Sequence, residues 1–158
     1  MPELPEVQTT ASGLDKVLRG LIIINIWNDY NSSYFKGKDN IKDPAYFKYF
    51  KKEVIGESVL NVTRRAKNVL INLKNNKTIL VHMKMTGHLM YGTYTQNKKY
   101  NGREWPWIPT EKESSLLDPY NRHIHVVFTL SNKHHLVFCD SRKFGTIVVE
   151  KTDTLHTE

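Results

Sequence analysis

The chain begins with a proline and a glutamate that could place a catalytic amine at its N-terminus. A small second residue such as proline normally permits removal of the initiator Met1, which would leave Pro2 with a free secondary amine. An α-amino group titrates near pH ~7.7–8.0, against about 10.4 for lysine, so much of it is neutral at physiological pH. A neutral secondary amine attacks an aldehyde to give an iminium ion, which acts as an electron sink. Glu3 is the neighbouring acid/base candidate.

The same residues also suit the start of a helix. Proline is favoured in the first helical turn, and glutamate interacts favourably there with the helix dipole. Pro2, Glu3, Pro5 and Glu6 therefore fit a helix start as well as a reactive terminus. The rest of the chain has to decide between these two interpretations.

Composition indicates one basic domain in a reducing compartment. The 158 residues can bury a real hydrophobic core as a single domain. The one cysteine, Cys139, excludes an internal disulfide framework and a multi-cysteine zinc site within the chain, and we expect a cytoplasmic protein. The longest aliphatic run, residues 21–24, is too short to span a bilayer. The net charge of +7 suggests a polyanionic partner, although it also fits a soluble basic domain.

Hydrophobic periodicity predicts two helices and a larger number of strands. Apolar residues recur at spacings of three and four from Leu4 to Leu18, which predicts an amphipathic helix that ends at Gly20 and carries the N-terminus. A second, short helix is expected over residues 44–52. Strand-like segments are residues 21–27, 57–65, 68–73, 78–82, 124–130, 135–139 and 146–150. The fold class is therefore mainly β with two α-helices, a β-sandwich or barrel of about eight strands.

Residues 92–121 interrupt this regularity and are expected to form a long surface excursion between two strands. The segment contains Trp105 and Trp107 among prolines and charged residues. Tryptophans in a loop can stack on nucleic-acid bases. An aromatic and proline plug packed on the sandwich is the favoured interpretation.

Two polar clusters lie where the chain turns between predicted strands. Arg64-Arg65-Ala66-Lys67 is a basic run that could grip phosphates or protonate a leaving group, or could be a solvated edge. In the segment of residues 82–87, Gly87 permits a tight turn with Met85 at its tip. An apolar side chain at a basic loop tip can wedge between stacked bases, although methionine more often fills a core.

A third cluster is Asp140-Ser141-Arg142-Lys143-Phe144-Gly145. In an extended segment Arg142 and Phe144 would point to one side and Lys143 to the other, giving a cation and an aromatic wedge with a phosphate clamp. The alternative is an ordinary charged hairpin. His123 and His125 could suggest a metal pair, but no third ligand is apparent, so a DNA-facing or surface pair is favoured.

Four of these motifs occur in the order seen in formamidopyrimidine-DNA glycosylases. They are the opening Pro2-Glu3-Leu4-Pro5-Glu6-Val7, the lysine of Arg65-Ala66-Lys67, the turn His82-Met83-Lys84-Met85-Thr86-Gly87 and the segment of residues 140–145. Each motif alone is weak, but four in order on a basic β-rich chain resemble this family over the whole length.

The resemblance implies a role for each matching residue. Pro2 resembles the nucleophile that attacks C1′ of a damaged nucleotide and forms a Schiff base, Glu3 the acid/base that assists opening of the sugar ring, and Glu6 a supporting residue. Lys67 resembles a lysine that binds phosphate and donates a proton in strand cleavage. The gap left by an extruded base would be filled by Met85, Arg142 and Phe144, and the DNA backbone would be contacted by His82, His123 and Lys143.

The implied activity is that of a bifunctional DNA glycosylase and abasic-site lyase of base-excision repair. Its substrates would be oxidised purines, 8-oxoguanine and formamidopyrimidines, in double-stranded DNA. The endonuclease VIII branch, which acts on oxidised pyrimidines, shares Pro2 and Glu3. It typically has glycine where Leu4 stands and lacks the wedge residues, which here are Met85, Arg142 and Phe144. An N-terminal-proline tautomerase would need no basic turns. A catalytically silent DNA-binding β-domain is the remaining alternative.

The resemblance also sets expectations for domain organisation. Residues 1–150 are expected to form the N-terminal catalytic β-sandwich domain, and residues 151–158 the start of an interdomain linker. Family members continue into a helix-two-turns-helix and zinc-finger domain. We therefore expect an isolated N-terminal domain that acts as a monomer and holds no metal itself, with zinc in the C-terminal domain. Ser141 and Lys143 depart from the family, which often has proline and arginine at these positions.

Overall fold

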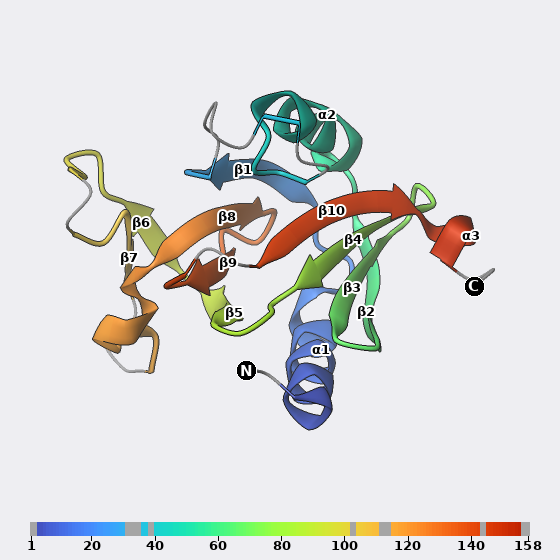
Figure 1. The fold of residues 1–158 in the computed structure, drawn as a ribbon, viewed down its shortest axis with the longest axis horizontal. Coiled ribbons are helices and arrows are strands. Elements are labelled where there is room, and N and C mark those ends of the chain that lie inside the picture. The colour runs from blue at the N-terminus through green and yellow to red at the C-terminus, as the bar shows by residue number, and fades with distance from the viewer. Residues whose placement is uncertain are drawn as a thin grey trace.

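Two four-stranded antiparallel sheets form the body of the molecule (Figure 1). The computed structural model describes residues 3–30, 36–37, 40–101, 104–110, 115–142 and 145–155. In spatial order, the first sheet contains β1 (Ile23–Asn28), β8 (Ile124–Leu130), β9 (His135–Asp140) and β5 (Gly87–Gly92). The second contains β10 (Thr146–Lys151), β4 (Lys77–His82), β3 (Asn68–Leu73) and β2 (Val59–Arg65). The prediction of a mainly β sandwich with about eight strands is confirmed.

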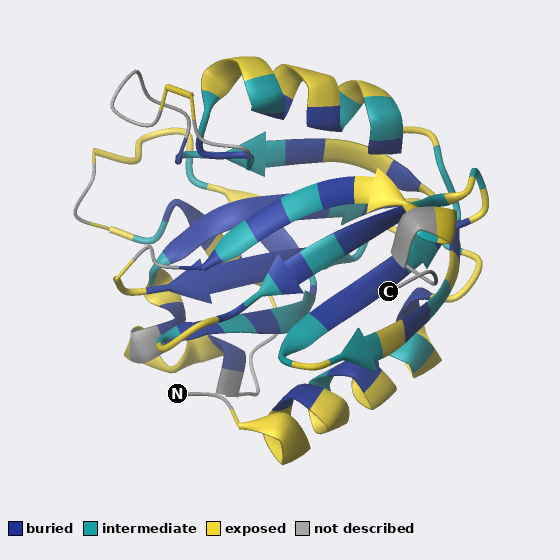
Figure 2. Cartoon of the chain, turned by 45° about the vertical axis from the view of Figure 1, so that its right-hand side comes forward, coloured by how far each residue is buried: buried dark blue, intermediate teal, exposed yellow. Residues whose placement is uncertain are grey.

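Helix α1 (Leu4–Leu18) lies against β2 and β3 at one edge of the second sheet. Its apolar side chains Val7, Ala11, Leu14 and Leu18 are buried, as their spacing predicts. Figure 2 shows this buried stripe turned toward the strands and an exposed face turned outward. Asp15 fixes the helix to the edge strand, because its Oδ1 accepts a hydrogen bond from the backbone N–H of Val62 at 2.8 Å.

Helix α2 (Pro44–Val54) packs near β1 and β10, on the opposite side of the sandwich from α1 (Figure 1). Asp43 caps it by accepting a hydrogen bond from the N–H of Ala45 at 3.3 Å, and Pro44 opens its first turn. Phe50 is fully buried and meets Phe128 of β8 edge-on, with ring centroids 6.3 Å apart. The helix is therefore part of the main core. None of the described helices is long and apolar enough to cross a membrane.

The segment of residues 92–121 carries more structure than its sequence suggests. It contains a short hairpin of β6 (Tyr94–Gln96) and β7 (Trp107–Pro109), followed by 3₁₀ turns at Ser115–Leu117 and Pro119–Arg122. Trp107 is 8% exposed and forms a small second core with Tyr94, Val127 and Val137. The expected aromatic plug is therefore confirmed for Trp107, and the loop is docked on the sandwich.

Two further elements differ from the sequence-based expectation. Strand β5 was not predicted, because its apolar residues span only Leu89 to Tyr91 between two glycines. The last strand extends to Lys151, one residue beyond the expected 146–150, and a short helix α3 (Thr152–Leu155) follows.

Candidate functional site

Strand register brings three turns to one edge of the molecule. In the second sheet His82 on β4 lies opposite both Asn68 on β3 and Thr146 on β10. The β2–β3 turn ends just before Asn68, the β4–β5 turn begins just after His82, and the β9–β10 turn ends just before Thr146. In the first sheet Gly87, where β5 begins, lies opposite Asp140, where β9 ends. The three clusters singled out in the sequence are therefore neighbours.

Two glycines let the β4–β5 and β9–β10 turns approach one aromatic ring. A Cβ atom on Gly87 would lie 2.6 Å from the carbonyl oxygen of Met83 and 2.6 Å from Cζ of Phe138. A Cβ atom on Gly145 would lie 2.3 Å from the same Cζ atom. Nonbonded carbon atoms pack at about 3.5–4.0 Å, and Phe138 is fully buried. Neither position has room for a larger residue unless the ring moves.

Asp140 joins the same two turns by hydrogen bonds. Its side chain is fully buried at the end of β9. Its Oδ1 accepts hydrogen bonds from the hydroxyl of Thr86, in the β4–β5 turn, and from the N–H of Arg142. Its Oδ2 accepts a hydrogen bond of 2.7 Å from the N–H of Gly145. One buried carboxylate therefore satisfies donors from both turns.

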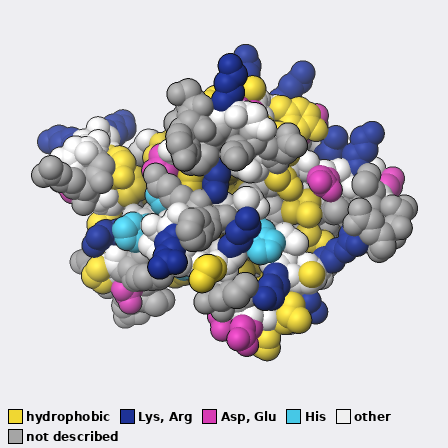
Figure 3. All heavy atoms as spheres, in the orientation of Figure 1, with side chains coloured by type: hydrophobic (Ala, Val, Ile, Leu, Met, Phe, Trp, Pro, Cys, Tyr) yellow, Lys and Arg dark blue, Asp and Glu magenta, His cyan; other side chains and the backbone are white. Residues whose placement is uncertain are grey.

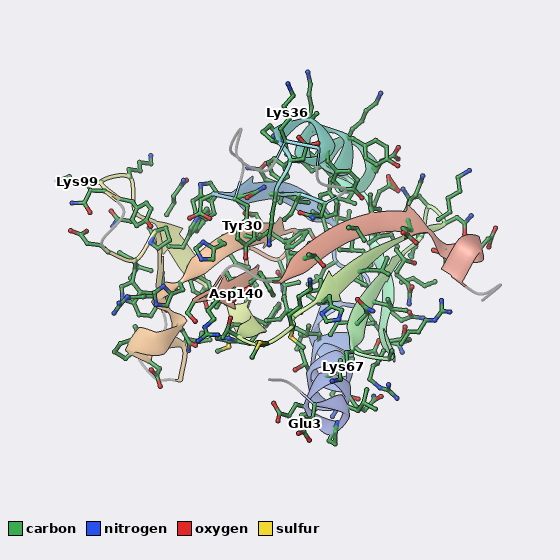
Figure 4. All side chains as sticks on the ribbon, viewed as in Figure 1. Glu3, Tyr30, Lys36, Lys67, Lys99 and Asp140 are labelled. Atoms are coloured by element: carbon green, nitrogen blue, oxygen red, sulfur yellow. The ribbon has the colours of Figure 1, made fainter. Side chains whose placement is uncertain are left out.

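The β2–β3 turn is held against helix α1. Arg64 donates a hydrogen bond from Nε to Oε1 of Gln8 on the helix, at 3.0 Å, and another from Nη1 to the carbonyl oxygen of Ala66, at 3.1 Å. Ala66 has a φ of 51°, which closes the turn tightly. Lys67 follows it, half-buried, alongside the helix (Figure 4). Arg64 thus positions the turn that carries Lys67.

Glu3 stands at the exposed end of α1 (Figure 4). It is the N-cap residue with an extended backbone, and its carbonyl oxygen accepts a hydrogen bond of 3.0 Å from the N–H of Val7. Glu6 is also exposed, in the first turn. Pro2 lies outside the described residues. A helix start is therefore confirmed here, and it is compatible with a reactive residue directly in front of Glu3.

The β4–β5 turn presents a partly buried histidine and an exposed methionine. His82 Nδ1 accepts a hydrogen bond of 3.2 Å from the N–H of Lys84. Burial, and then the positive charges of Lys84 and Lys67, lower the pKa of His82 and favour its neutral form. Met85 is 50% exposed, whereas Met83 is only 2% exposed and belongs to the core. The turn therefore directs Met85 into solvent, as expected for its tip.

His123 and His125 do not form a surface pair. His123 precedes β8, and burial, followed by the charge of Arg122, lowers its pKa. His125 is only 7% exposed, and its Nδ1 lies 2.8 Å from Oδ1 of Asp29 while its ring stacks on Tyr30. The expectation that His125 faces DNA or solvent is therefore wrong, because its side chain is buried against Asp29 and Tyr30. Within the described ranges no group of three or more His, Cys, Asp or Glu residues could hold a metal.

The β9–β10 turn is bent rather than extended at Ser141 and Arg142. The extended backbone on which the expected alternation depends is therefore not found at these two residues. Arg142 is nevertheless exposed. Lys143 and Phe144 lie outside the described residues.

Sequence reasoning gave no role to Asp140, Thr86 or Arg64 individually. The one available signal for Asp140 was an acidic residue at the end of an apolar strand, two residues before Arg142 and five before Gly145. Such a position predicts burial only if the strand end is enclosed, and pairing of β9 with β5 encloses it.

The face that carries these turns is predominantly basic. Figure 3 shows Lys, Arg and His side chains distributed over its middle, with few acidic side chains among them. The carboxylate of Asp140 is buried below the surface and does not contribute an exposed negative group. The described part of this edge therefore suits a phosphate backbone, with an apolar tip at Met85.

Known proteins match this chain over nearly its full length. The formamidopyrimidine-DNA glycosylase N-terminal domain family matches residues 1–147. Formamidopyrimidine-DNA glycosylase from Pelotomaculum thermopropionicum is 36% identical over 155 residues, which are 98% of this chain and 45% of the relative. The protein of the same name from Rickettsia bellii is 30% identical over 158 residues, 100% of this chain and 46% of the relative. The chain thus spans about half the length of these relatives.

Solved structures give the same result. The complex between the Lactococcus lactis protein and DNA containing FAPY-dG aligns with a TM-score of 0.68 at 26% identity, over 98% of this chain and 46% of that one. A MutM complex with DNA containing carbocyclic 8-oxo-G aligns with a TM-score of 0.70 at 26% identity, over 99% of this chain and 47% of that one. On sequence and fold together, the chain belongs to the formamidopyrimidine-DNA glycosylase N-terminal domain family.

Proposed function

We propose that this chain carries the catalytic domain of a bifunctional DNA glycosylase and abasic-site lyase of base-excision repair. The observation that carries the proposal is the convergence of three basic turns at one edge of the molecule, one of which is hydrogen-bonded to the N-terminal half of α1. Family membership and the DNA complexes of similar structures support it. The partner is double-stranded DNA containing damaged bases or abasic sites.

The proposed chemistry starts at Pro2. Its neutral amine forms a bond to C1′ of the damaged nucleotide, the glycosidic bond breaks, and the base leaves with the bonding electrons and a proton. Glu3 is the acid/base that assists opening of the sugar ring, with Glu6 as a supporting residue. The resulting iminium acidifies the C2′ proton, so its loss expels the 3′ phosphate, and a second elimination releases the 5′ phosphate. Lys67 binds phosphate and donates a proton in strand cleavage.

Access to C1′ requires the nucleotide to leave the base stack, which costs a few kcal/mol. Met85, Arg142 and Phe144 would fill the space that the nucleotide vacates, while His82, His123 and Lys143 contact the backbone. The exposure of Met85 and Arg142 on adjoining turns supports this assignment. Leu4 and the wedge residues favour oxidised purines, 8-oxoguanine and formamidopyrimidines, over the pyrimidines of the endonuclease VIII branch.

Borohydride trapping tests the proposal. The protein, shown by mass spectrometry to begin at Pro2, is incubated with abasic-site DNA and reduced. We expect a covalent adduct that disappears when Pro2 is made internal by an N-terminal extension, because the secondary amine is then an amide. DNA binding without any adduct, at low salt and high protein concentration, would instead support the silent DNA-binding alternative.

A panel of duplexes tests the substrate class. Excision of 8-oxoguanine and formamidopyrimidine, with little excision of oxidised pyrimidines, is the expected result, and the reverse preference would favour the endonuclease VIII-like alternative. A monomeric, cytoplasmic protein is part of the same proposal, as is a zinc finger outside residues 1–158.

A further inference from the structure

We propose that Asp140 is a positioning residue that couples the β4–β5 and β9–β10 turns, so that Met85 and Arg142 enter the base stack as one unit. This inference rests on the proposed function and adds to it a residue that touches neither the DNA nor the reacting atoms. Asp140 is 0% exposed, so its carboxylate acts only through the groups bonded to it.

The described residues of the two turns meet at their bases, at the ring of Phe138 and at Asp140. Each turn passes from one sheet to the other, from β4 to β5 and from β9 to β10. They are aligned at their bases, where Gly87 lies opposite Asp140 and His82 opposite Thr146. Beyond these pairs, the hydroxyl of Thr86 reaches across to Oδ1 of Asp140. Among the described residues, this side-chain hydrogen bond links the two turns beyond the ends of the strands.

The same carboxylate also shapes its own turn. The N–H groups of Arg142 and Gly145 donate to Oδ1 and Oδ2 at 3.2 Å and 2.7 Å. Thr86 is adjacent to Met85, and the N–H that bonds to Oδ1 is that of Arg142 itself. Asp140 is therefore hydrogen-bonded directly to the backbone of Arg142, and it is linked to Met85 through the adjacent Thr86.

A coupled pair of turns has a physical advantage in extruding a nucleotide. If the two loops inserted independently, each would lose conformational entropy at the moment of binding. A pre-organised site avoids that entropy loss. Hydrogen bonds to a buried charged acceptor are among the stronger ones in proteins. Coupling should therefore matter for extrusion from a duplex and much less where the sugar is already accessible.

Thr86→Val is the sharpest perturbation, because it removes the bridging hydroxyl with little change in volume and leaves the other bonds of Asp140 in place. Thr86→Ser keeps the hydroxyl and is the matched variant. Thr93→Val is the control at a distance, since Thr93 Oγ1 lies 2.6 Å from Thr110 Oγ1 beside the β6–β7 hairpin. Denaturation of each full-length variant shows that it is folded.

Two rates are measured: single-turnover excision of a damaged base from a duplex, and borohydride trapping on single-stranded DNA with an abasic site. We expect Thr86→Val to lower duplex excision about 10- to 100-fold, the loss of one strong hydrogen bond, and to leave trapping within about twofold. Thr86→Ser should restore most of the excision rate, and Thr93→Val should leave both rates near those of the unchanged protein.

Coupling is tested by combining Thr86→Val, in the β4–β5 turn, with Arg142→Ala, in the β9–β10 turn. If the turns act as a unit, the double variant should lose much less than the product of the two single losses. Equal losses in excision and trapping, or independent losses in the double variant, would overturn the inference while leaving the proposed function intact. Absence of trapping by the unchanged protein would instead remove the proposed function, and this inference with it.

Discussion

Gly145 provides a direct test of how closely the site turns must pack. Replacement by alanine adds one Cβ atom, which would lie 2.3 Å from Cζ of Phe138 and 3.1 Å from Oδ2 of Asp140. A normal carbon–carbon contact is about 3.5–4.0 Å, so the ring or the turn has to move by more than about 1 Å. The ring is fully buried, and Gly87 approaches the same Cζ atom. The ring of Phe138 therefore cannot move away from Gly145 without approaching other packed atoms, including those of Gly87.

This geometry sets the expected loss of stability in Gly145→Ala. Overpacking a filled core typically costs about 1–3 kcal/mol, and the enclosed ring places Gly145→Ala near the upper end, at about 3 kcal/mol of the free energy of unfolding. In a domain of this size that lowers the melting temperature by roughly 6–12 °C. Gly13→Ala is the matched control, because nothing lies within 4 Å of its added Cβ in the exposed interior of α1. It should raise stability by about 0.5–1 kcal/mol.

Chemical denaturation of the two variants and the unchanged protein measures both effects. Combining Gly145→Ala with Phe138→Leu, which removes the Cζ atom, should reduce the added loss to under about 1 kcal/mol. If Gly145→Ala unfolds at the same denaturant concentration as the unchanged protein, the close approach of the turns to Phe138 is not a constraint and the reasoning fails.

Three other predictions concern separate parts of the molecule. The pKa of Asp15 is lowered by hydrogen bonds from Arg19 and then from the N–H of Val62. Its contribution to stability is therefore complete at pH values above the ordinary aspartate pKa of about 4, and it is lost as the pH falls through the pKa of Asp15 in the folded protein. Asp15→Asn should be less stable at neutral pH and lose less stability on acidification; parallel denaturation curves for both proteins would contradict this. Burial lowers the pKa of His82, and a nearby phosphate would raise it, so DNA binding should take up a proton and tighten between about pH 7.5 and 5.5. An unchanged pH dependence of the dissociation constant in His82→Gln would show that His82 does not contact the backbone. Trp107→Ala should cost about 3–5 kcal/mol in thermal denaturation, because Trp107 fills the second core, and Ile108→Ala on the exposed side of the same strand should cost far less. Equal losses would mean that the hairpin is not docked.

Local patterns predicted most of the elements. Spacings of three and four between Leu4 and Leu18 gave helix α1, and alternation from Ile124 to Leu130 gave β8, because these periods are properties of the backbone geometry itself. Strand β5 is not recognisable from the sequence, because its three apolar residues are consecutive and lie between two glycines, so they show no alternation of apolar and polar residues. It exists because β9 pairs with it along its whole length.

The candidate site was predictable as residue types and not as an arrangement. Glu3, Lys67 and Met85 were identified as separate motifs, and the family resemblance gave them roles. His125 shows the limit of that reasoning, since its polar side chain suggested the surface. Its burial is permitted by Asp29, the residue after β1, which supplies a hydrogen-bond partner from almost a hundred residues away in sequence.

The sequence by itself determined the fold class and the basic character, because period and charge are local properties, and it supplied the reactive residues as a prediction. The tertiary structure alone decided that His82 stands between Asn68 and Thr146, and that a carboxylate at the end of β9 reaches Thr86. Register and close approach depend on how distant strands pair and pack, and no local pattern specifies them. Three turns far apart in the chain thereby become one edge of the molecule.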